Sequence, residues 1–243
     1  MSTFNFSSIA DRFSEDVSVS NTTLSAMLSK VYWWMTLSLI LTGFTAFAVS
    51  RIPALIELIY TKSFVLYTLI GVQLVLALLF IGRFNKLSFT AAGIFFALYS
   101  LLTGVMFSSI FVLFTSESIA LTFFITAGTF AGMSVYGYFT KKNLNSIGSF
   151  LIMGLWGVIL ASLTNLFLQS AAIQWITSYV GVIVFVGLTA YDTQKIKETL
   201  IQHSQDGITD TGMKVALFGS FMLYLDFINL FLELLEFFGR SDD

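Results

Sequence analysis

A run of 49 residues without a charged side chain separates Lys142 from Asp192. A helix needs about 20 mainly apolar residues to cross the roughly 30 Å hydrocarbon core of a bilayer, so this run is long enough for two crossings. The more polar segment LQSAAIQ at 168–174 predicts the hinge between them. Charged residues make up 11% of the chain and hydrophobic residues 56%, whereas a soluble domain is roughly a quarter charged. The chain is therefore predicted to be a polytopic membrane protein.

Five further apolar segments complete a predicted set of seven spans. They lie at 31–50, 63–82, within 87–116, at 118–140 and at 213–238. The chain has a single proline, Pro53, so long helices can form, and the short alternating segments of a β-barrel are absent. We expect an all-α bundle of seven helices in one membrane domain at 30–240. A polar, partly disordered tail at 1–29 precedes it.

The Lys and Arg residues predict how the bundle is oriented. With the N-terminus in the cytoplasm, nine of the twelve lie on the inner side, and only Arg51, Lys62 and Arg240 lie outside. Cytoplasmic loops carry an excess of Lys and Arg, so the N-terminus is predicted to be cytoplasmic. Seven full crossings would put the C-terminus outside, whereas a last segment that enters and returns would leave it inside. The sequence leaves both open.

The last predicted span carries an acidic residue near its middle. A charge at the centre of a membrane helix costs about 2.5 to 3.5 kcal/mol, so Asp226 needs a partner or a function, and we favour an ion or proton role. Asn229, Glu233 and Glu236 follow at helical spacing on the same face, which we expect to avoid lipid. For the two glutamates a position near the far headgroups is the simpler interpretation, and lining of an ion path is the alternative.

A second acid, Asp192, ends the long uncharged run. It could form an ion pair with Lys195, three residues on, or approach Asp226, in which case the two carboxyl groups could share one proton. At 1.5 Å per residue, Asp226 lies about 20 Å along its helix from Met213, but Asp192 lies near the predicted inner end of its own span. Direct contact therefore requires either that the last helix starts later or that the preceding helix extends beyond the membrane.

Small residues predict where helices pack closely. Gly128 and Gly132 are four residues apart in AGTFAG, on one face of the fourth predicted span. Such pairs let helix backbones approach closely in lipid. We expect both glycines to lie against neighbouring helices within the bundle.

Four segments resemble the Bax inhibitor-1 family of membrane proteins. They are GRFNKLS (82–88), YGYFTKKNLNSIGSFL (136–151), AYDTQKIKE (190–198) and LYLDFINLF (223–231). The resemblance implies a seven-helix bundle with the last helix near the centre and a pH-sensitive calcium leak. It also implies that Asp192 and Asp226 match a hydrogen-bonded pair that senses pH, and that Arg83 matches an arginine close enough to influence that pair. Asn143 stands where related sequences often have an acid, which weakens a role for charge in that loop.

The two membrane acids, taken together with this resemblance, predict a cation leak and no enzymatic activity. Protonation of the pair formed by Asp192 and Asp226 would hold the helices together, and ionisation would present oxygen ligands to calcium. A tight calcium site uses six to eight oxygens, so two carboxylates predict weak coordination. We expect no cofactor, with calcium as the transported ion, and we expect the protein to lie in the plasma membrane if it is bacterial.

Two other function classes stay open. The first is a non-transporting regulator that restrains a membrane protease or a stress or cell-death pathway, since bacterial members of the resembled family are linked to membrane stress and protease regulation and eukaryotic ones to suppression of cell death. The second, more remote, is an intramembrane aspartyl protease. Those enzymes have a Gly-x-Gly before the second aspartate, where this chain has Tyr224 and Leu225. No phosphate-binding glycine loop or basic aromatic patch is present, which disfavours ATP-driven transport and nucleic-acid binding.

Overall fold

The computed structural model describes residues 6–204 and 209–239, with side chains described for 22–203 and 209–239. These residues form nine α-helices and one 3-10 helix and contain no strand. The elements are α1 (Phe6–Ser50), α2 (Pro53–Thr61), α3 (Ser63–Arg83), η1 (Phe84–Lys86), α4 (Phe89–Phe107), α5 (Ile110–Leu113), α6 (Ser116–Phe139), α7 (Asn145–Leu168), α8 (Ala171–Ser204) and α9 (Asp210–Phe238).

Seven segments of the described chain are long and apolar enough to cross a membrane. They are Thr22–Ser50, Ser63–Lys86, Phe89–Leu113, Ser116–Phe139, Asn145–Leu168, Ala171–His203 and Asp210–Phe238. Each overlaps one predicted span, so the prediction of an all-α, multi-pass integral membrane protein is confirmed. Helix α1 begins at Phe6 and thus passes through most of the predicted tail. Partial disorder of that tail stays a prediction, and residues 1–5 lie outside the described residues.

Local sequence signals fix where several helices begin and end. The hydroxyls of Ser88, Thr115 and Thr209 accept hydrogen bonds from the backbone N–H groups of Ala91, Ser118 and Gly212, at 3.2, 3.3 and 3.1 Å. Such side-chain caps satisfy N–H groups that have no partner within the helix. Helix α7 ends at Leu168, and the next residue, Gln169, caps it with a φ of 49° in the left-handed region. The hinge between α7 and α8 therefore falls inside the predicted segment 168–174.

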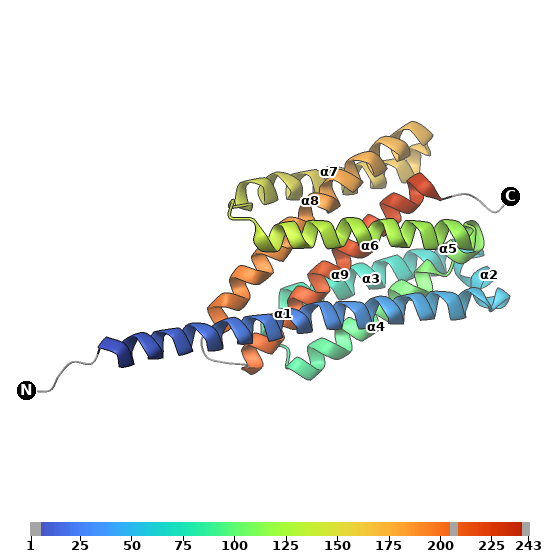
Figure 1. Cartoon of the computed structure of the whole chain (residues 1–243). Coiled ribbons are helices and arrows are strands. Elements are labelled where there is room, and N and C mark those ends of the chain that lie inside the picture. The colour runs from blue at the N-terminus through green and yellow to red at the C-terminus, as the bar shows by residue number, and fades with distance from the viewer. Residues whose placement is uncertain (1–5, 205–208, 240–243) are drawn as a thin grey trace, which may run out of the picture.

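Helix α9 lies at the centre of the bundle (Figure 1) and packs against α8, α1, α6 and α4. In its most apolar window 67% of the residues are buried, compared with 39% in the next most buried span and 6% in the span that contains α3. Helices α3 and α7 are peripheral and pack mainly against α4 and α8. The prediction that the last helix is central is confirmed.

Helix α9 is continuous over 29 residues, which corresponds to about 43 Å at 1.5 Å per residue. Its Phe238 end and the Phe6 end of α1 lie at opposite ends of the molecule (Figure 1). The last segment thus crosses fully rather than entering and returning. We call the end of the bundle where α8 ends and α9 begins the α8–α9 end, and the opposite end, with Gln169 and Phe238, the α7–α8 end. Placement of the N-terminus in the cytoplasm stays a prediction.

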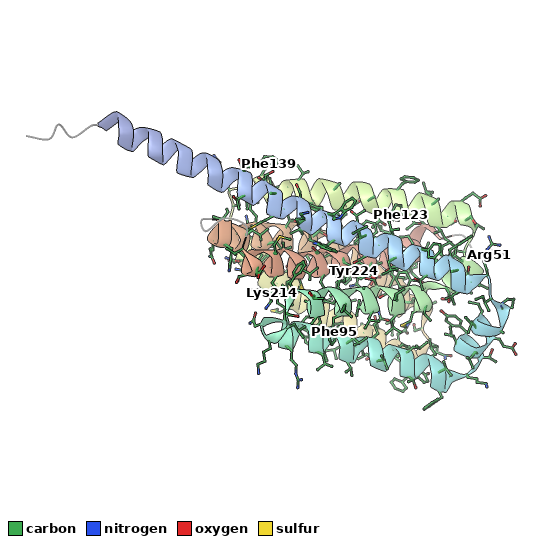
Figure 2. All side chains as sticks on the ribbon, turned by 90° about the horizontal axis from the view of Figure 1, so that it is seen from below. Arg51, Phe95, Phe123, Phe139, Lys214 and Tyr224 are labelled. Carbon is green, nitrogen blue, oxygen red and sulfur yellow. The ribbon has the colours of Figure 1, made fainter. Side chains whose placement is uncertain are left out.

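The sides of the bundle are apolar. Phe124, Phe139 and Phe167 are 73%, 71% and 88% exposed, and Phe139 projects outward from the bundle in Figure 2. A soluble monomer rarely exposes a contiguous apolar surface of this kind. The exposed side chains therefore face lipid.

The expectation for Gly128 and Gly132 is wrong. Both glycines are exposed, and a Cβ added at either would meet no atom within 4 Å. The buried face of α6 instead carries Thr122, Thr126, Phe130 and Ser134 at intervals of four, which turns the glycines toward lipid. Close approach occurs further along, at Gly137, where an added Cβ would collide with the backbone of Ala190 on α8.

Candidate functional site

Helix α8 is longer than a membrane crossing requires. It continues for twelve residues beyond Asp192, to Ser204, which adds about 18 Å. Asp192 thus lies inside the bundle rather than at the end of its helix. The extension of the preceding helix, which the sequence required for contact with Asp226, is present.

Contacts between α8 and the antiparallel α9 set the register of the two helices. Gly219 packs against Ile196 on one side, where an added Cβ would come within 3.0 to 3.2 Å of the isoleucine side chain. Gly181 packs against Glu233 on the other side. Asp192 and Asp226 lie between these two contacts. We refer to this stretch as the α8–α9 interface.

Asp192 of α8 and Asp226 of α9 lie next to each other at this interface. Asp226 is 5% exposed and its Oδ2 is buried without a hydrogen-bond partner, whereas Asp192 is partly exposed. Ionised carboxylates only accept hydrogen bonds, so this approach is favourable when one of the two carries a proton. Among the described residues, no Lys, Arg or His side chain hydrogen-bonds either carboxyl group, and Lys195 is exposed.

Residues that flank Asp192 anchor α8 to other elements. The Tyr191 ring lies against Gly148 of α7, and the Thr193 hydroxyl donates to the Ser134 Oγ of α6 at 3.4 Å. These contacts surround Asp192 with fixed neighbours on both sides. The position of its carboxyl group at the interface is therefore set by its helix and not by a mobile loop.

Two further residues of the segment AYDTQKIKE (190–198), Gln194 and Lys197, hold the connection between α6 and α7. Gln194 accepts from the Leu144 N–H at 2.9 Å and donates to the Lys142 carbonyl at 2.9 Å. Lys197 donates to the Tyr138 carbonyl at 2.7 Å and lies over the Tyr138 ring. Within AYDTQKIKE (190–198) the sequence pointed to Asp192 and Lys195 and gave no role to Gln194 or Lys197.

Arg83 is exposed at the end of α3. The next residue, Phe84, is buried and its ring lies 4.7 Å from that of Phe218 on α9. Lys214 of α9 lies over the Phe84 ring and donates to the Asn85 carbonyl at 3.4 Å. The segment 82–88 thus docks on the start of α9 through Phe84, and an influence of Arg83 on the aspartates stays a prediction.

The remaining polar residues of α9 differ in their contacts. Asn229 is half-buried and its side chain donates to the Leu225 carbonyl of its own helix at 2.8 Å. Glu233 is half-buried, and its carboxyl group lies against Gly181 of α8. Glu236 is exposed and accepts a hydrogen bond from Gln174 of α8. The two glutamates therefore pack against α8, in line with the expectation that this face avoids lipid.

The opposite face of α9 holds a polar contact that the sequence did not reveal. Tyr224 is fully buried, and its hydroxyl lies 2.7 Å from the Thr42 Oγ1 of α1. Thr42 in turn donates to the Ser100 carbonyl of α4 at 3.0 Å. Figure 2 shows Tyr224 between the ends of the bundle marked by Lys214 and Arg51. Its position two residues before Asp226 was the only signal in the sequence.

Metal ligands are sparse among the described residues, which contain no group of three or more His, Cys, Asp and Glu side chains able to hold an ion. Asp192 and Asp226 together offer two carboxylates. Such a pair suits a proton or a weakly held cation better than a resident metal, since a tight calcium site uses six to eight oxygens.

Comparison with known proteins identifies the family of this arrangement. Residues 24–243 match the family described as inhibitor of apoptosis-promoting Bax1. The chain belongs to the Bax inhibitor-1 family. Among relatives, the inner membrane protein YbhL of Escherichia coli is 46% identical over 95% of this chain and 99% of its own length. An uncharacterized protein of Borreliella burgdorferi is 46% identical over 88% and 91%, and the uncharacterized protein YrjE of Lactococcus lactis is 33% identical over 89% and 91%.

The family assignment confirms the resemblance seen in the sequence. All four resembling segments lie within the matched residues. In the structure of this Bax inhibitor-1 family member, the segments with Asp192 and Asp226 lie along the α8–α9 interface. The segments at 82–88 and 136–151 supply neighbouring contacts to Lys214 and Tyr191.

Proposed function

We propose that this protein is a pH-sensitive leak for calcium across a membrane, gated by Asp192 and Asp226. The observation that supports the proposal is that Asp192 and Asp226 lie next to each other where the central helix packs against α8, with Asp226 buried. Acids inside a membrane protein are expensive and mark ion or proton paths. The relatives named inner membrane proteins support a location in the bacterial inner membrane, for which we propose a cytoplasmic N-terminus.

The proposed gate works through one shared proton. With a proton between them, the carboxyl groups of Asp192 and Asp226 attract each other and hold α8 against α9. Loss of that proton leaves two negative charges in contact, and their repulsion is strong because the interior screens charge poorly. The helices then separate, so flux is low in acid and rises as the pH increases.

The chemistry of the open state suits a hard cation. Two ionised carboxylates offer oxygen ligands of the kind that calcium prefers, but they are fewer than the six to eight of a tight site. The ion would therefore bind briefly and pass, as a leak requires. The mechanism uses no cofactor and no chemical reaction, so we propose no enzymatic activity.

The test is calcium flux into proteoliposomes that contain the purified protein, measured from about pH 6 to about pH 8. Flux that rises with pH in the wild-type protein, and that loses this dependence in Asp192→Asn and Asp226→Asn, is the expected result. Arg83→Gln should shift the pH profile if Arg83 acts on the pair. Background flux at every pH would contradict the leak and favour a regulator that binds a membrane protease or stress protein.

A further inference from the structure

A polar cavity of about 420 Å³ lies between α7, α8 and α9 at the α7–α8 end of the bundle. Its polar lining comes from Ser162, Asn165, Gln169, Gln174, Thr177, Ser178 and Glu233. The turn between α7 and α8 and the last turns of α9 lie close together at this end (Figure 1). The cavity is therefore built by three helices and is separate from the pair formed by Asp192 and Asp226.

The backbone of the turn is fixed by side chains that line the cavity. The Asn165 Oδ1 accepts from the Ser170 N–H at 2.8 Å, and Gln169 takes up its left-handed conformation between them. Gln174 is held by its hydrogen bond to Glu236. The oxygen-bearing side chains of the cavity thus lie on a braced turn and on helices.

The carboxyl group of Glu233 occupies the space that a side chain at position 181 would fill if that residue were not glycine. A Cβ added at Gly181 would lie 2.6 Å from the Glu233 carboxyl carbon and 2.7 Å from its Oε1. The carboxylate therefore rests directly on the α8 backbone, and Ser178 of the same helix lines the cavity with it. Any residue larger than glycine at 181 would displace it.

The charge of the cavity selects the kind of ligand. Glu233 is the only ionisable residue among those that line it, and Glu236 is next to Gln174. The other polar lining groups are amides and hydroxyls, whose oxygens are hard ligands of the type that calcium and magnesium prefer. One carboxylate with several neutral oxygens and room for water fits a partly hydrated divalent cation.

The cavity lies closer to the α7–α8 end of the bundle than the aspartate pair, and α9 contributes a residue to both. Glu233 is seven residues beyond Asp226 on α9, about 10 Å along the axis. Between them, fully buried Leu230 packs in an apolar cluster with Val184 and Leu188 of α8. In this structure the cluster separates the cavity from the pair.

We propose that this cavity is a binding site for a hydrated divalent cation, with Glu233 as its charged ligand and Gly181 as the residue that gives the carboxylate its place. With one carboxylate, the affinity for calcium should fall in the weak range of about 10⁻⁴ to 10⁻³ M. The use of the site as the entrance of a cation path rests on the proposed leak, whereas the binding itself does not.

The experiment is a titration of the detergent-solubilised full-length protein with terbium, read by tryptophan-sensitised luminescence and followed by displacement with calcium. Glu233→Gln removes the negative charge. Gly181→Ala leaves the charge in place on Glu233 but moves the carboxylate away from the α8 backbone. We expect each to weaken calcium displacement at least about tenfold, which is about 1.4 kcal/mol. Glu57→Gln, at an exposed glutamate, and Gly157→Ala, where an added Cβ meets no atom within 4 Å, are the matched controls and should bind as the wild type.

Three outcomes would overturn the site. They are calcium binding by Glu233→Gln equal to that of the wild type, absence of saturable binding in the wild type, and displacement by sodium as effective as by calcium. Should Gly181→Ala fail to fold, Glu233→Gln alone decides. Asp226→Asn should retain binding even though the proposed leak requires Asp226, so the failure of one proposal is distinguishable from the failure of the other.

Discussion

The two faces of α9 differ in the kind of side chain that they present to neighbouring helices. Toward α1, α3 and α4, the helix presents Phe221 and Tyr224, both fully buried among other aromatic rings. Toward α8 it presents Asp226, which lies next to Asp192, and Glu233, whose carboxyl group lies against the backbone of Gly181. One helix thus carries a face of interlocked rings and a face of ionisable groups.

The difference separates what holds the bundle together from what can change with conditions. Contacts between rings depend on shape and do not respond to protons. The contact between two carboxyl groups is attractive with one proton and repulsive with none. We therefore expect the aromatic face to act as a fixed support against which α8 moves.

The largest expected effect is on the aromatic face. The Phe221 ring lies 4.4 Å from Phe80, 5.1 Å from Tyr99 and 5.4 Å from Phe96. Phe221→Ala should lower the free energy of unfolding by about 3 to 5 kcal/mol, because it leaves a cavity where three rings meet. Unfolding in a denaturing detergent series measures the loss. A change of less than about 1 kcal/mol would contradict the view of this face as the fixed support.

A smaller effect is expected where α6 crosses α8. Gly137→Ala places a methyl group against the Ala190 backbone and should cost about 1 to 3 kcal/mol through overpacking. Gly132→Ala, in open space on the same helix, is the control and should be neutral or slightly stabilising. Equal stability of the two variants would show that the close approach of α6 and α8 does not contribute to stability.

The smallest effect is expected for the Tyr224 hydroxyl. Tyr224→Phe removes its hydrogen bond with Thr42 but leaves Thr42 bonded to the Ser100 carbonyl. The loss should be about 1 kcal/mol in the same unfolding series, and the pH profile of calcium flux should match that of the wild type. A flattened profile would mean that the aromatic face takes part in pH sensing and that the two faces are not separate in function.

Much of the fold could be predicted from the sequence because membrane insertion depends on local composition. The uncharged runs located all seven spans, and the polar segment at 168–174 located the hinge. The glycines of α6 were assigned wrongly, since a spacing of four shows that Gly128 and Gly132 share a face but not whether that face meets a helix or lipid. Contact between Asp192 and Asp226 could not be decided either, because it depends on how far α8 continues beyond the apolar run.

The site was predicted in part. Asp192, Asp226 and Glu233 were visible as acids in apolar surroundings, which is a local signal. The roles of Gly181 and Gln194 depend on partners more than 45 residues away in the chain, so no local pattern could reveal them. Arg83 was chosen through the resemblance, whereas the structure gives the docking contact to its neighbour Phe84.

The most direct test of the account is a distance measurement across the two faces of α9. The chain contains no cysteine, so spin labels can be placed at Glu198→Cys on α8 with Thr211→Cys on α9, and at Ser29→Cys on α1 with Thr211→Cys, all at exposed positions. Raising the pH from about 6 to about 8 should lengthen the α8–α9 distance, leave the α1–α9 distance unchanged, and have no effect on either distance in Asp226→Asn. An α8–α9 distance that stays constant in the wild-type protein would contradict the central claim that a shared proton holds these helices together.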